Sequence, residues 1–211
     1  MREVLARRPG MLVTSDGECF EGEVVGIAAA DPERVAAGEV VFNTALSGYQ
    51  EIISDPSYSG QIIAFTYPHI GNYGTNPEDD ESAAPACAGI IVRELSQAPS
   101  NWRSGRSLAG YLNDHEISCI TDVDTRRLTR HIRQFGAVPA AFGVDEAHVR
   151  LAASAALGTD GMDLASGVTT DVAYHVSTIG SRFSVVAYDF GIKRTILRQL
   201  QAAGCEVTVV P

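Results

Sequence analysis

Short blocks of apolar residues, separated by turn-forming residues, run through the first 157 positions of the chain. Residues 11–27 predict a β-hairpin, because two strand-like runs flank Asp16-Gly17, a pair typical of tight turns. Residues 47–54 fit either a short helix or the entry to a strand. Further apolar runs predict strands at 38–45, 61–67, 88–95 and 137–144.

Helical spacing of apolar residues occurs in three stretches. Residues 107–115 and 145–157 each predict a helix, and 117–136 predict a strand, a turn and an amphipathic helix. Strands and helices are thus mixed along the chain, which indicates an α/β or α+β fold.

The amphipathic helix within 117–136 has clear end signals. Asp122 or Asp124 is expected to cap its start, and Gly136 to end it. Its solvent faces are expected to carry Arg126, Arg127, Arg130 and Arg133, and its buried face Leu128, Ile132 and Phe135.

The pattern changes after residue 157. Residues 158–182 are small, polar and weakly periodic, which suits a linker. Residues 183–211 then predict a β-α-β unit with strands at 183–188 and 205–210, a helix at 192–203 and Gly204 as its cap. We therefore expect a first domain over 1–157 and the start of a second domain over 183–211.

Composition narrows the possible functions. The net charge of −10 argues against general binding to nucleic acid, which needs clustered Lys and Arg. No apolar run approaches a membrane span, and the N-terminus lacks the apolar core of a signal peptide. The four cysteines are far apart in sequence, which suggests neither a disulfide framework nor a metal site. We expect a cytoplasmic protein without a metal or a membrane partner.

The reactive side chains give weak signals for catalysis. Cys19 lies in GECFEG, where the second glycine comes one position too late for a nucleophile elbow, and Cys87, Cys119 and Cys205 are expected to be buried and inert. His69 is interpreted as a loop histidine, and the acidic run 76–82 as a solvated turn. Asp189-Phe190-Gly191 lacks the other kinase motifs and is expected to be a strand end that turns into a helix.

Ser57 is a more interesting candidate. It lies in SDPSYSG, where Asp55-Pro56 starts a turn that can present a hydroxyl. Without a neighbouring histidine it is a poor nucleophile, but it can hydrogen-bond a ligand carboxylate or ammonium. Spacing alone favours a turn without a further role.

Four stretches in order change that balance: GEVVFNTALSGYQEIISDPSYSGQIIAFTYPHIGNYGTN, DVDTRRLTRHIRQFGA, DGMDLASGVTT and VVAYDFGIKRTILRQL. Together they closely resemble the small subunit of glutamine-dependent carbamoyl-phosphate synthase, and the resemblance runs from about Met11 to Pro211. It implies an N-terminal domain of three β/β/α layers, followed by the first β-α-β of a flavodoxin-like glutamine amidotransferase domain.

The resemblance also implies a function and a site. In this family the small subunit hydrolyses L-glutamine and passes ammonia to a large subunit, which uses ATP and bicarbonate to make carbamoyl phosphate for pyrimidine and arginine synthesis. The family serine that matches Ser57 contributes to the glutamine site from across the domain boundary. No cofactor is expected in this chain, since ATP belongs to the large subunit.

The family's catalytic Cys, His and Glu come later than the stretches present here. The resemblance therefore implies no catalytic residue in this chain, and no glutaminase activity by the chain alone. Two other hypotheses stay open: a stand-alone ligand-binding or interaction domain, and an autonomous hydrolase that uses Cys19 or Ser57.

Overall fold

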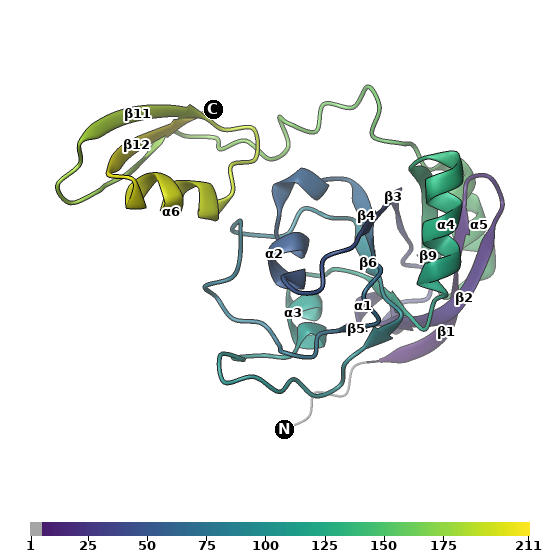
Figure 1. Cartoon of the computed structure of the whole chain (residues 1–211). Coiled ribbons are helices and arrows are strands. Elements are labelled where there is room, and N and C mark those ends of the chain that lie inside the picture. Colours follow the sequence, from purple (N-terminus) through teal and green to yellow (C-terminus); the bar gives the residue numbers. More distant parts are fainter. Residues whose placement is uncertain (1–5) are drawn as a thin grey trace.

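A computed structural model describes residues 6–211 and shows a large N-terminal part joined by an extended segment to a small C-terminal sheet (Figure 1). The N-terminal part is built on a closed sheet of seven strands. In order around the barrel these are β1 (Arg7–Thr14), β2 (Cys19–Val25), β8 (Cys119–Thr121), β6 (Gly89–Ile91), β4 (Gln61–Phe65), β3 (Ala36–Asn43) and β9 (Val138–Gly143).

The barrel closes because β9 pairs with two strands. It runs antiparallel to β1, with Phe142 opposite Leu12, and antiparallel to β3, with Phe142 opposite Ala36. β3, β4, β6 and β8 are parallel to one another, whereas β1 and β2 form the antiparallel hairpin predicted from Asp16-Gly17. A sheet closed in this way has no free edge.

Successive residues of the barrel strands point to two different apolar clusters. Leu12, Ile62 and Phe142 lie in the interior cluster, together with Leu128 and Ile132 of the amphipathic helix. Their neighbours in sequence point outward, into clusters that helices cover. Both faces of β4, β6 and β8 are therefore buried, which explains why these strands are continuous apolar runs in the sequence.

The helices are short and most have side-chain caps. Asp124 caps α4, and Ser107 and Asp145 cap α3 and α5 by accepting hydrogen bonds from backbone N–H groups. The full set is α1 (Ile27–Ala30), α2 (Tyr49–Ile53), η1 (Pro56–Tyr58), α3 (Leu108–Asp114), α4 (Thr125–Phe135), α5 (Glu146–Ala155) and α6 (Arg194–Ala202).

Helix α4 follows the sequence prediction except at one position. Leu128 and Ile132 are buried, the four arginines are exposed, and Gly136 ends the helix. Phe135 was expected on the buried face, but 63% of it is exposed. It lies in the last turn, beyond the edge of the barrel core, and its ring packs against His131 instead (centroids 4.8 Å apart).

The stretch 88–95, expected as one strand, is divided. β6 joins the barrel, whereas β7 (Glu94–Leu95) pairs with β5 (His69–Ile70) in a separate two-stranded sheet. His69 is therefore at a strand rather than in a free loop, and its Nδ1 lies 3.0 Å from Glu94 Oε2.

The C-terminal sheet has the order β10-β12-β11. β11 (Phe183–Tyr188) and β12 (Cys205–Val210) are parallel and joined by α6, as predicted. β10 (Tyr174–Val176) was not predicted; it lies within the expected linker and pairs antiparallel with β12.

The mixed α/β class is confirmed. The three-layer β/β/α arrangement is not confirmed, because seven of the N-terminal strands form one closed sheet. Among residues 6–211, no helix is both long and apolar enough to cross a bilayer.

Candidate functional site

Ser57 lies in the 3-10 turn η1, and the sequence explains its position. Asp55 Oδ1 accepts a hydrogen bond from the Ser57 backbone N–H (2.9 Å), and Pro56 is buried as the first residue of the turn. Ser57 itself is exposed, and its hydroxyl forms no hydrogen bond within residues 6–211. The turn thus presents a free hydroxyl.

The loop between β11 and α6 lies directly against this turn. Lys193 Nζ is 3.2 Å from Asp55 Oδ2, and the space beside Gly191 is bounded by Pro56. The ion pair joins residues 138 positions apart in sequence. The structure therefore brings SDPSYSG and DFGIKR together.

Asp189 holds the loop in shape. Its side chain is nearly buried, with a residue exposure of 5%. Oδ1 accepts hydrogen bonds from Gly191 N (2.9 Å) and Ile192 N (2.8 Å), and Oδ2 accepts one from Thr170 N (2.9 Å). The aspartate of DFG is thus a structural acceptor at the strand end, which agrees with the sequence interpretation.

Glu81 makes a second connection between the two parts. Its carboxylate accepts hydrogen bonds from Thr195 N (2.9 Å) and Thr195 Oγ1 (2.6 Å) at the start of α6. Its own N–H donates to Ser54 Oγ (2.9 Å), the first residue of the SDPSYSG segment. One residue therefore fixes the start of α6 relative to the turn that carries Ser57.

Glu81 corrects the interpretation of the acidic run as a solvated turn, since it is only 8% exposed. No local pattern distinguishes Glu81 from the exposed Glu78, because the partner of the Glu81 carboxylate, Thr195, comes from α6. Helix α6 has Lys193 at its N-cap and no side-chain cap, so the N–H groups of its first turn need an acceptor from another part of the chain.

Gly191 offers a test of this contact. It has φ +90°, and a Cβ there would lie 3.0 Å from Pro56 Cβ and 3.0 Å from Val168 Cγ2. Gly180 has a similar φ of +68° but open space around it. Gly180→Ala should cost about 1–2 kcal/mol from backbone strain alone, and Gly191→Ala about 1–3 kcal/mol more from overpacking. Urea unfolding of both variants measures the difference; equal losses would contradict the tight contact.

The cysteines are not placed for catalysis at this site. Burial raises the pKa of the Cys87 and Cys119 thiols to about 12, and Cys205 is buried under α6 in the C-terminal sheet. The Cys19 thiol lies near the Gly17 carbonyl oxygen (3.6 Å), in the β-hairpin. Over the described range 6–211, no three His, Cys, Asp or Glu side chains group closely enough to hold a metal ion.

Sequence comparison identifies the family of the chain. A family profile described as carbamoyl-phosphate synthase small chain, CPSase domain, matches residues 12–142, more than half of the chain. The chain belongs to this family. The matched residues span the barrel from β1 to β9, and the match ends before the β11–α6 loop.

Relatives in the carbamoyl-phosphate synthase small chain family extend the likeness beyond the barrel. The carbamoyl phosphate synthase small chain of Synechococcus sp. is 44% identical over 220 residues, which cover 97% of this chain and 55% of the relative. That of Vibrio parahaemolyticus is 46% identical over 220 residues, with 95% and 57% covered. The chain thus spans a little over half the length of these relatives.

Proposed function

We propose that this chain works within a glutamine-hydrolysing carbamoyl-phosphate synthase of the cytoplasm. In that enzyme L-glutamine would be hydrolysed to ammonia, and a large chain would use the ammonia with ATP and bicarbonate. Family membership and the printed names of the relatives support this proposal.

The chain's own part would be to form one wall of the glutamine site. The contact of the Ser57 turn with the β11–α6 loop is the observation that carries this proposal. Ser57 presents a free hydroxyl there, which can donate to a ligand carboxylate or accept from a ligand ammonium group. The nucleophile, its base and the oxyanion hole would come from outside the residues described.

The C-terminal sheet would be the first part of a flavodoxin-like amidotransferase domain. The parallel pair β11 and β12, joined by α6, supports this assignment, since such units start doubly wound sheets. β10 would then be an antiparallel strand added to that sheet.

Replacement of Ser57 by alanine in the complete enzyme tests the glutamine role. Loss of a hydrogen bond to a charged ligand group should lower glutamine-dependent kcat/KM about 10- to 100-fold. Synthesis from added ammonia should be unchanged, because it bypasses the glutamine site.

Ser59→Ala is the matched control, since Ser59 ends the same turn. It should change neither activity more than about twofold. Equal loss of glutamine- and ammonia-dependent activity in Ser57→Ala would refute the proposed role. Ammonia release from glutamine by residues 1–211 alone would favour the autonomous hydrolase instead.

A further inference from the structure

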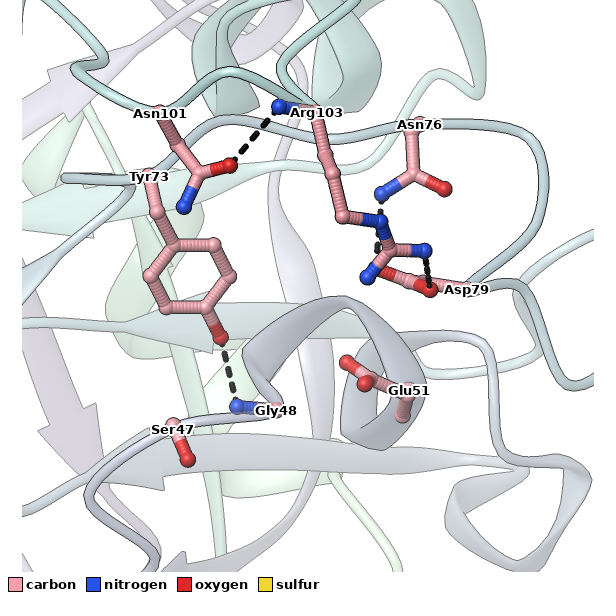
Figure 2. Close-up of a pocket in the computed structure, with 8 residues that line it drawn as sticks. All are labelled: Ser47, Gly48, Glu51, Tyr73, Asn76, Asp79, Asn101 and Arg103. Atoms are coloured by element: carbon pink, nitrogen blue, oxygen red, sulfur yellow. Dashed lines mark hydrogen bonds and ion pairs between the residues drawn. The ribbon is translucent and has the colours of Figure 1, made fainter.

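A cavity of about 230 Å³ opens beside α2, and Ser57 is not among its lining residues (Figure 2). Its walls come from three segments, 47–51, 73–79 and 101–103, which are far apart in sequence. None of these lining residues has a role in the proposed glutamine site.

The walls of this cavity are held in place by hydrogen bonds. Tyr73 Oη accepts from the backbone N–H groups of Gly48 (2.5 Å) and Tyr49 (3.1 Å), and the rings of Tyr73 and Tyr49 stack with centroids 4.2 Å apart. Asp79 accepts from Arg103 Nη2 (2.7 Å) and Asn76 Nδ2 (2.6 Å) (Figure 2). The cavity is therefore preformed rather than a gap between loose loops.

Glu51 lacks the partners that Asp79 has. Its Oε2 atom is buried but has no hydrogen-bond partner within residues 6–211. Arg103, the cation in the lining, is already engaged by Asp79 and by Glu78 (3.3 Å). Burial raises the pKa of the Glu51 carboxyl, as do the charges of Asp79 and Glu81, whereas a hydrogen bond from its own backbone N–H and the charge of Arg103 oppose the shift. A buried acceptor of this kind needs a donor from elsewhere.

Two large apolar side chains adjoin the cavity lining in sequence. Leu46 precedes Ser47 and is 74% exposed; Trp102 lies between Asn101 and Arg103 and is 91% exposed. Exposed Trp and Leu beside a polar hollow are typical of protein–protein contact sites, where Trp, Tyr and Arg supply most of the binding energy.

We propose that this cavity receives an arginine or lysine side chain of the large chain, whose surrounding apolar surface covers Leu46 and Trp102. The lining carries two carboxylates, Glu51 and Asp79, against one guanidinium, so a cation is the complementary occupant. The two exposed apolar groups favour a protein surface over a free small cation as the occupant. This inference rests on the proposed function, since it takes the large chain as the partner.

Binding of the complete small chain to the large chain, measured by titration calorimetry, tests the inference. Glu51→Gln keeps the shape but removes the charge, and should weaken binding about 10- to 100-fold. Trp102→Ala should have a similar effect. The thermal midpoint of free Glu51→Gln should be no lower than that of the wild type, because burial and the neighbouring carboxylates disfavour the charge that it removes.

Matched controls separate this site from general surface effects. Glu21→Gln removes an exposed charge on β2, and Leu157→Ala removes a side chain as exposed as Leu46 (74% each). Both should bind within about twofold of wild type, whereas Leu46→Ala should bind several-fold more weakly. Added KCl should weaken wild-type binding more steeply than Glu51→Gln binding, because only the wild type forms the ion pair.

Wild-type affinity in both Glu51→Gln and Trp102→Ala would overturn the inference and leave the proposed function intact. A second result would also overturn the inference: millimolar methylguanidinium stabilises the wild type but not Glu51→Gln, and complex formation with the large chain does not change. The cavity would then bind a small molecule. A wild-type protein that binds no large chain would overturn the proposed function as well.

Discussion

Replacement of Phe142 by alanine should lower the free energy of unfolding by about 3–5 kcal/mol. Phe142 is fully buried in β9, where it pairs with Leu12 of β1 on one side and Ala36 of β3 on the other. Its ring fills the space beside Gly89, where a Cβ would come within 2.9 Å of it. Truncation therefore opens a cavity at the seam where the barrel closes.

Urea unfolding followed by far-UV circular dichroism measures this loss. Phe135→Ala is the control, since it removes the same ring from an exposed position at the end of α4. It should cost less than about 1 kcal/mol. A loss below about 1 kcal/mol for Phe142→Ala would mean that the seam is not tightly packed.

Replacement of Glu81 by alanine should release the start of α6 from the N-terminal part. The variant loses both acceptors of Thr195 and leaves its N–H without a partner, which should cost about 2–3 kcal/mol. Amides of residues 194–197 should then exchange with solvent about 30- to 150-fold faster, while amides of the barrel strands keep their protection.

Hydrogen exchange followed by mass spectrometry resolves the two regions. Glu78→Ala, three positions earlier in the same acidic run, is the control, because the Glu78 side chain is 82% exposed and reaches only Arg103. Its exchange pattern should match that of the wild type. Unchanged exchange of α6 in Glu81→Ala would show that the remaining contacts suffice to hold the two parts together: the Lys193–Asp55 ion pair and the hydrogen bonds from Arg194 N to Glu81 O and from Arg198 Nη2 to Glu78 O.

Much of the secondary structure could be predicted from local patterns. The β1-β2 hairpin, helix α4 and the parallel β11-α6-β12 unit each have a period, a cap or a turn that identifies them. β10 has no such signal, because three residues of mixed polarity become a strand only by pairing with β12. Closure of the barrel was also missed, since it depends on which strands β9 pairs with.

The candidate site was predictable only in part. Turn chemistry predicted an exposed hydroxyl at Ser57, but only the family resemblance gave it a role in glutamine binding, and that role stays a prediction. In the sequence, Glu81 and Glu51 look like any solvent-exposed glutamate, and only the fold distinguishes them. Glu81 is buried where it meets α6, and Glu51 has a buried oxygen without a partner in the cavity beside α2. Such differences arise from contacts distant in sequence, which local patterns do not encode.

The double pairing of β9 also determines when the barrel can form during synthesis. β1 and β2 leave the ribosome first, but the strand that seals them to β3 ends at Gly143. At translation speeds of ~5–20 residues per second, the nascent hairpin waits on the order of 10 s with unpaired outer strands. During that interval its unpaired edges are open to pairing with other chains.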